Sequence, residues 1–511
     1  MPDIHVGTNG AKARQRAAAP ERSPLARLRA IWRQHHDLLS NASTLAATTG
    51  VSSALGFAYW AIAARLFKQE SVGYGAAGVS AMTLLGTIGM LGMGTLLIGE
   101  LPRRRARAGL VSAALLTCAV GSGVLGLGFA VLAPHFSGRF GHVTGTPLQA
   151  ALFVAGVVLT GVSLVFDQAT IGLMRGGLQL VRNAVFAAGK VLALPAAAII
   201  LHDKFGVGVT ASWVAGLGLS MVLLAIRLRL AHLPVLPRPD LGVLRRLGRT
   251  AIAHNWLNLA ITIPMTLIPV LVTVIVSPSA NAAFYAAWTL SGFLKVVPTH
   301  LSTVLFAVAA ADPQIIARKL RFTLRLSVIL GVPGMLVLGF GAHFALSLFG
   351  PGYASAATLP LWLLVIGYLP TIPKMQYIAV CRAAGRIPRA AAVMTAAAVM
   401  EVGASAAGGA YGGLKGLSFA LLAVYLIEGI ILTPPVIRAA LGRGRHRQAG
   451  QVASASKQPS GTSRPPEGPL ALEISEQAKR DLQEAGIAAL LLIAEGQAVI
   501  SRPQVEAGER T

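Results

Sequence analysis

Several ionisable side chains lie within long apolar stretches of the sequence, where a charge is costly unless it faces a polar space or a partner. The cations are Lys190, Lys295, Lys374, His254 and His300, and the acids are Asp167, Glu401 and Glu428. Buried cations suit a polyanionic group such as a pyrophosphate, because ammonium and phosphate form charge-assisted hydrogen bonds. The acids could pair with the lysines or bind a coupling H⁺ or Na⁺. These residues are therefore the candidates for ligand binding and ion coupling.

Lys295 is the deepest of these cations, since it lies 14 residues beyond residue 281, where we expect its apolar helix to begin. His254 and Asn258 are four residues apart and would share one face of a helix, so Asn258 joins the binding candidates. A purely structural role competes at each position. Lysines near a membrane surface can snorkel, ion pairs can be structural, and polar residues also hold helices together.

Motifs that would indicate an enzyme are missing from the sequence. There is no glycine-rich phosphate loop ending in Lys-Ser or Lys-Thr, no nucleophile elbow and no His-Glu-x-x-His. Cys118 and Cys381 give neither a metal spacing nor a disulfide framework. A membrane glycosyltransferase would need acidic residues in its loops, and the outward connections offer only Glu70 and Asp203. We therefore predict a protein without catalytic activity, cofactor or bound metal.

The chain has the composition of a membrane protein. Of its 511 residues 54% are hydrophobic and 12% are charged, whereas soluble proteins carry about 25% charged residues. About 20 apolar residues cross the roughly 30 Å hydrocarbon core as a helix, which satisfies its own backbone there. We expect an all-α polytopic membrane protein with about 12 transmembrane helices, at 41–65, 73–99, 109–133, 148–174, 183–201, 207–230, 251–276, 281–310, 322–349, 357–381, 388–408 and 415–438.

The net charge of +25 gathers at the ends of these segments, without a motif that would indicate nucleic-acid binding. Every second connection is rich in arginine, as in Arg103–Arg107, and the alternate connections carry few basic residues. Arg65 and Lys68 form a mild exception. Because positively charged loops stay in the cytoplasm, we expect a cytoplasmic-membrane protein with both termini in the cytoplasm. The first 40 residues are polar and basic, so no cleavable signal peptide is expected.

The apolar segments divide into two halves of six. The connection 231–250 contains three prolines and separates a lobe at 41–230 from a lobe at 251–438. The motif Tyr74-Gly75-Ala76-Ala77 resembles Phe284-Tyr285-Ala286-Ala287, about 210 residues later. Because six is even, the two lobes would be related by a pseudo-twofold axis along the membrane normal.

Three further segments lie outside the two lobes. We expect a cytoplasmic basic tail at 1–40 and a flexible linker at 439–468, which is rich in Gly, Ser, Gln and Pro. Residues 469–511 regain apolar content and form either a small cytoplasmic element or a disordered tail.

The stretch Ala46–Pro102 resembles the start of polysaccharide-biosynthesis flippases of the multidrug/oligosaccharidyl-lipid/polysaccharide exporter (MOP) superfamily. The similar features are an apolar first span with Gly50 and Gly56, then Ala64-Arg65-Leu66, then Gly73-Tyr74-Gly75 and a glycine-rich second span that ends in a basic cluster. The two halves of six extend this resemblance over 41–438.

The resemblance implies two six-helix lobes around a central cavity that opens alternately to each face of the membrane. The cargo it implies is a polyprenyl-pyrophosphate-linked oligosaccharide, carried across the cytoplasmic membrane for cell-surface polysaccharide synthesis. The expected partners are this lipid-linked glycan, membrane lipids and envelope-synthesis enzymes that could bind the C-terminal tail, and nucleic acid is not among them. The family supplies no strict signature, so the site residues rest on burial and charge.

Three alternatives compete with this function. A cation-coupled multidrug exporter of the same superfamily would need an interior dominated by acids, whereas lysines here match the acids in number. A lipid II flippase would often carry two further spans. A non-transporting membrane scaffold would recruit envelope-synthesis enzymes through 469–511, and deleting this tail would reveal that role.

Overall fold

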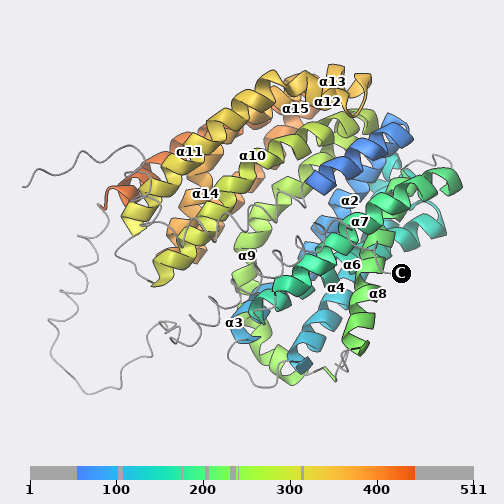
Figure 1. Cartoon of the computed structure of the whole chain (residues 1–511), viewed down its shortest axis with the longest axis horizontal. Helices are drawn as coiled ribbons and strands as arrows, with labels where there is room; N and C mark the ends of the chain where they lie inside the picture. The colour runs from blue at the N-terminus through green and yellow to red at the C-terminus, as the bar shows by residue number, and fades with distance from the viewer. Residues whose placement is uncertain are drawn as a thin grey trace, which may run out of the picture. The chain divides into compact units, whose positions relative to one another are not determined.

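Helices make up nearly all of the computed structural model of the chain, which describes residues 54–101, 108–173, 176–201, 206–230, 238–239, 241–311 and 316–442. The predicted tails at 1–40 and 469–511 lie outside these residues, as does all but the beginning of the predicted linker at 439–468. The described residues form two groups of helices, called here the first lobe and the second lobe (Figure 1). The predicted all-helical, two-lobed architecture is confirmed.

The first lobe runs from residue 54 to residue 230. It contains the helix Ala54–Leu66, α2 (Gln69–Gly89), α3 (Met93–Glu100), α4 (Ala108–Phe136), the short η2 (Gly138–Phe140) and α5 (Gly141–Thr144), α6 (Pro147–Gly172), α7 (Gly176–Leu201) and α8 (Val207–Leu230). The second predicted span is broken between α2 and α3. Leu91 has a φ of 48° and Gly92 a φ of 79°, which a continuous helix does not allow.

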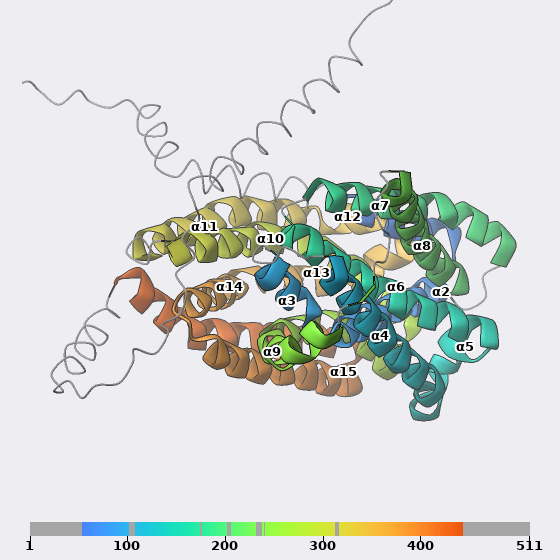
Figure 2. The same ribbon diagram turned by 90° about the horizontal axis from the view of Figure 1, so that it is seen from below.

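The second lobe runs from residue 241 to residue 442. It contains α9 (Leu241–Leu271) with a terminal π-helical turn η3 (Val272–Val276), α10 (Pro278–Ala311), α11 (Ile316–Phe340), α12 (Ala342–Ser347), α13 (Pro351–Ile366), α14 (Tyr368–Ala383) and α15 (Ile387–Ala440). α9 packs along α15, as Figure 2 shows, and also contacts α2 and α3 of the first lobe.

α15 is a helical hairpin rather than one straight helix. Gly412 and Gly413 have non-helical backbone angles, and the φ of +57° at Gly413 favours glycine. Glu401 and Glu428 both contact the ammonium of Lys374, although 27 residues of straight helix would hold them roughly 40 Å apart. The chain therefore reverses at these glycines, which separate the predicted spans 388–408 and 415–438.

A helix or a helix pair occupies each of the twelve predicted ranges. Eight described helices are long and apolar enough to cross a membrane, and the pair α13 and α14, bent by 46°, makes a ninth candidate. The remaining ranges hold α10, the second arm of α15 and the helix Ala54–Leu66, which belongs to a predicted span whose earlier residues are not described.

Two helices, α9 and α7, begin seven or more residues before the predicted start. α9 begins at Leu241, so half of the predicted connection 231–250 is helical, because helix formation continues through the polar arginines beyond the apolar segment. α7 begins at Gly176 instead of residue 183, which places Arg182 inside a helix, where it is 5% exposed. Hydropathy marks where a helix enters the apolar layer, whereas the helix itself can start earlier.

The two lobes meet where α2 and α10 begin. The Asn281 amide donates to the carbonyl oxygen of Gly73 at 2.9 Å, and the Gln69 amide donates to that of Ser279 at 3.0 Å. These pairs are 208 and 210 residues apart, which is the length of the sequence repeat. Equivalent residues of two repeats touch only at the axis that relates them, so the contacts agree with the predicted pseudo-twofold.

We predict that Gly73→Ala destabilises the protein. A Cβ atom at Gly73 would lie 1.7 Å from the carbonyl oxygen of Pro278, so the lobes would have to separate or α2 would have to shift. The melting temperature of the purified protein in detergent should fall by several degrees. Gly56→Ala is the matched control, because a Cβ there meets no atom within 4 Å. Equal melting temperatures for both variants would contradict the prediction.

Candidate functional site

Lys374 joins the two arms of the α15 hairpin to α14. Its ammonium donates to Oε1 of Glu401 and, at 2.9 Å, to Oε2 of Glu428. The three side chains are almost completely buried, with exposed fractions of 8%, 4% and 5% for Lys374, Glu401 and Glu428. Oε1 of Glu428 is buried without a hydrogen-bond partner among the described residues. Two carboxylates thus share one lysine.

Lys295 lies beside this cluster, near the middle of α10. Its ammonium is 5.1 Å from the ring centroids of both Trp288 and Tyr425, which is within the range of cation–π attraction. Trp288 is two turns earlier on α10, and Tyr425 is one turn before Glu428 on α15. The ammonium of Lys295 is also close enough to the carboxyl groups of Glu401 and Glu428 to attract them electrostatically. It forms no direct ion pair with a described residue.

Lys190 occupies an aromatic cage in the first lobe. Its ammonium lies 4.1 Å from the ring centroid of Trp213, 4.6 Å from that of Phe186 and 4.9 Å from that of Tyr59. The side chain is buried, and within the described residues it meets no carboxylate. Cation–π attraction to desolvated rings is worth about 2 kcal/mol, which compensates part of the cost of burying the ammonium.

A row of aromatic rings connects Lys190 to the second lobe. Trp60 lies 6.1 Å from Trp213 in the cage and 4.7 Å from Tyr285 of α10, measured between ring centroids. Tyr285 precedes Trp288, the ring under Lys295, by about one turn of the same helix. The two lysines therefore lie at opposite ends of a row of rings that crosses from the first lobe to the second, with the Lys374 cluster next to Lys295.

The remaining candidates lie elsewhere. Asp167 accepts two hydrogen bonds from Arg182, at 3.0 and 2.7 Å, in an ion pair between α6 and α7. The Asn258 side chain accepts from Arg382 at 3.0 Å and approaches the hydroxyl of Thr95 at 3.4 Å. His300 is partly exposed on α10, five residues after Lys295, and the side chain of His254 lies outside the described residues. Within the described ranges, no three His, Cys, Asp or Glu side chains gather in a way that could hold a metal ion.

We predict that Asp167→Asn destabilises the fold. The substitution leaves the buried Arg182 guanidinium without its partner, which typically costs about 3–5 kcal/mol. Thermal unfolding in detergent would measure this loss. The double variant Asp167→Asn with Arg182→Gln should recover much of it, because no buried charge is left alone. A double variant as unstable as the single one would refute this explanation.

Two arginines of the first lobe bind backbone carbonyl groups of the second lobe. Arg139 donates to the carbonyl oxygens of Thr273 and Val274 at 2.8 and 2.7 Å, and Arg65 donates to those of Leu348 and Ser347 at 2.9 and 2.8 Å. The acceptors lie in the last turn of the helix formed by α9 and η3 and at the C-terminal end of α12, where carbonyl groups lack intrahelical partners and attract cations. These two contacts are called here the arginine latches.

The arginine latches lie at the end of the lobes where the connections carry few basic residues. The contacts of α2 with α10 are at this end too, as is the ring pair Phe57–Phe349 at 5.1 Å. Toward the arginine-rich connections, α10, α11 and α14 of the second lobe diverge from α4 and α8 of the first lobe, whereas α9 stays beside α3 (Figure 1). The latch also explains why Arg65 departs from the charge pattern of the loops, since this residue binds the opposite lobe.

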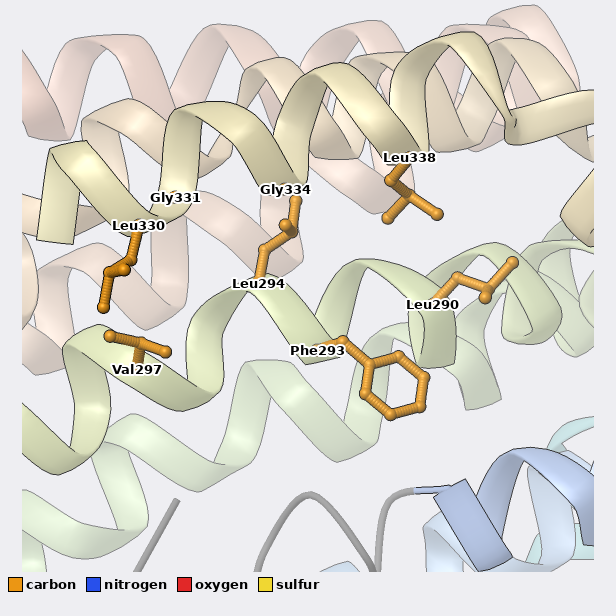
Figure 3. Close-up of a pocket in the computed structure, with 8 residues that line it drawn as sticks. All are labelled: Leu290, Phe293, Leu294, Val297, Leu330, Gly331, Gly334 and Leu338. Carbon is orange, nitrogen blue, oxygen red and sulfur yellow. The ribbon is translucent and has the colours of Figure 1, made fainter. Parts of the chain in front are cut away.

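An apolar cavity of about 290 Å³ lies between α10 and α11 (Figure 3). The residues Leu290, Leu294 and Val297 of α10 face Leu330 and Leu338 of α11 across it, and Gly334 leaves room between them. Its lining carries no charge, so it cannot bind an anionic headgroup. The charged site is therefore the lysine-containing interior rather than this cavity.

Sequence reasoning located the charges and missed their surroundings. The rings under the lysines follow helix spacing, since Phe186 is four residues before Lys190 and Trp288 seven residues before Lys295. That spacing could have identified both aromatic neighbours. Tyr59, Trp213 and Tyr425 come from other helices, and no local pattern connects them to a lysine.

The architecture is similar to that of solved multidrug and toxin extrusion (MATE) transporters. An inward-facing multidrug resistance MATE family transporter of the MOP superfamily superimposes with a TM-score of 0.61 at 13% identity, over 76% of this chain and 95% of that chain. A Vibrio cholerae MATE transporter gives 0.53 at 14% identity, over 79% and 98%. A MOP superfamily transporter from Pyrococcus furiosus, described as having a binding pocket of reversed polarity, gives 0.50 at 13% identity, over 79% and 95%.

The sequence matches no protein-family model and no curated protein. At these identities the structural similarity shows the fold alone. The chain therefore has the two-lobed, multi-pass fold that these solved transporters share.

Proposed function

We propose that the protein is a flippase that moves a polyprenyl-pyrophosphate-linked oligosaccharide across the cytoplasmic membrane by alternating access, for cell-surface polysaccharide synthesis. One observation carries the proposal. The acids Asp167, Glu401 and Glu428 all form ion pairs with cations of the protein, whereas the ammonium groups of Lys190 and Lys295 contact aromatic rings and form no direct ion pair with a described residue. These two ammonium groups are therefore the charged groups best able to take an anionic ligand as a direct partner.

An anionic headgroup needs such an interior. A pyrophosphate cannot enter about 30 Å of hydrocarbon unaided, because burying an unpaired charge costs many kcal/mol. The ammonium of Lys295, partly exposed near the middle of α10, would replace part of its hydration through charge-assisted hydrogen bonds. Lys190 would add long-range attraction from its cage. The polyprenyl chain would stay in the lipid between the lobes.

The arginine-rich connections orient the protein in this proposal. With those connections in the cytoplasm, both termini are cytoplasmic and the arginine latches lie at the outer face. The described conformation is then the one held closed toward the outside, and the headgroup would enter from the cytoplasmic side. Movement of one lobe against the other would break the latches and expose the cargo to the outer leaflet.

The same contacts argue against export of cationic drugs. An organic cation would need a free carboxylate or an aromatic cage. The carboxyl groups of Asp167, Glu401 and Glu428 all form ion pairs with Arg182 or Lys374, and the ammonium of Lys190 already fills the cage between Tyr59, Phe186 and Trp213. The scaffold alternative depends on 469–511, outside the described residues, and deleting this tail tests it.

Proteoliposomes that contain a fluorescent polyprenyl-pyrophosphate-linked sugar test the function directly. The expected result is movement of the sugar between leaflets, followed by quenching with a reagent that cannot cross the membrane. Protein-free liposomes give the background, and uptake of a fluorescent organic cation is measured in parallel. Transport of the cation without movement of the sugar would overturn the proposal.

A further inference from the structure

The Lys374 cluster carries a charge that its own members do not balance. Two carboxyl groups, Glu401 and Glu428, share one ammonium, so the cluster has a net charge of −1 when both are ionised. A net charge is costly in an interior of low dielectric constant. The nearby ammonium of Lys295 supplies the balancing charge as long as no anion has bound to it.

The geometry leaves a place for one proton. Oε1 of Glu428 is buried and accepts no hydrogen bond from any described residue. The carboxyl groups of Glu401 and Glu428 are close enough to form a hydrogen bond with each other when one of them is protonated. A metal ion has no comparable place, because the ammonium of Lys374 already sits between the two carboxyl groups.

We propose that Lys374, Glu401 and Glu428 form a proton-binding site in which the two carboxyl groups share one proton, and that an anion bound at Lys295 strengthens the binding of this proton. The anion cancels the charge of Lys295, so the cluster keeps an uncompensated negative charge until a proton from the solvent neutralises it. By linkage, the proton strengthens anion binding by the same factor. This inference rests on the proposed function, because the anion stands for the cargo headgroup.

The surroundings of Glu428 support this assignment. Its charged and titratable neighbours in the described part of the chain are Glu401 on the other arm of α15, Lys374 on α14, Lys295 on α10 and Tyr425 on its own arm. Tyr425 is a neutral phenol under Lys295. Only the two carboxyl groups can therefore take up the proton, and only Lys295 is available to an anion.

Infrared difference spectroscopy of the purified full-length protein tests the site without any transport assay. On acidification, the C=O stretch of a protonated carboxyl group should grow, and Glu428→Gln should remove it. Glu401→Gln provides a second variant should Glu428→Gln fail to fold, and Glu70→Gln, at an exposed carboxyl group on α2, is the control that keeps the band. A band that survives both cluster substitutions, or that Na⁺ abolishes, would overturn the proton site.

Inorganic pyrophosphate serves as the probe for the link to Lys295. Added at matched pH to the protein in weakly buffered solution, it should cause uptake of up to one proton per protein, measured with a pH indicator, and the carboxyl band should grow with it. In Lys295→Ala the band should be present without pyrophosphate and should not respond to it. Pyrophosphate binding without proton uptake would overturn the link. Failure of sugar movement in liposomes alongside a normal infrared result would instead count against the proposed function.

Discussion

Replacing Lys295 with alanine should slow movement of the lipid-linked sugar about 100-fold, because loss of one partner from a buried charge pair costs several kcal/mol. Lys295 is the described cation that is partly exposed, central in its helix and free of a direct ion pair. Lys295→Arg keeps the charge and should retain most of the activity. The rate of sugar movement in proteoliposomes is the measurement.

The control for this result is a lysine of the same lobe outside the site. Lys415 lies at the start of the second arm of α15, at the latched end, and Lys415→Ala should move the sugar at the wild-type rate. The melting temperature of each variant separates loss of function from loss of fold. Equal rates for Lys295→Ala and the wild type would remove Lys295 from the cargo site.

A covalent bond between α2 and α10 should stop transport completely. The side-chain amide of Gln69 reaches the carbonyl oxygen of Ser279 at 3.0 Å, so a short, reducible, thiol-reactive cross-linker can join cysteines at these positions in a chain with Cys118 and Cys381 replaced by alanine. The proposed alternating access requires this end of the lobes to separate, and the cross-link prevents that. Sugar movement should fall to background on cross-linking and recover after reduction.

The matched control places the bond inside one lobe. The indole of Trp362 on α13 donates to the carbonyl oxygen of Gly339 on α11 at 2.8 Å, and both helices belong to the second lobe. Cross-linking of cysteines at these positions with the same reagent should leave transport unchanged. Full transport by the cross-linked Gln69→Cys, Ser279→Cys protein would mean that the lobes do not separate here during the cycle.

Hydropathy was sufficient to locate the helices because the membrane imposes one rule on every span. It does not detect interruptions within a span, such as the break at Leu91–Gly92 or the bend between α13 and α14, since the residues there are as apolar as their neighbours. It also placed the start of α9 ten residues late, because Leu241–Thr250 is helical outside the apolar layer.

Because a charge is costly in lipid, the sequence identified Lys374, Glu401 and Glu428 as separate candidates. The structure shows that they form a single cluster. Their separations in sequence, 27 and 54 residues from Lys374, are set by the α15 hairpin and by the packing of α14 against it. A single sequence does not show which residues so far apart in the chain come into contact. The same limit applies to Asp167, whose partner Arg182 was placed in a connection instead of α7.

The arginine latches have a consequence for variation at the lobe interface. Arg65 and Arg139 donate hydrogen bonds to main-chain oxygens, which every residue type has. The side chains at positions 273, 274, 347 and 348 are therefore not needed for these hydrogen bonds. Substitutions at these four positions leave the arginine latches intact, provided that the helix ends keep their backbone conformation. Correlated changes between the two lobes would therefore be sparse at the arginine latches, because the side chains that these contacts require, Arg65 and Arg139, both belong to the first lobe.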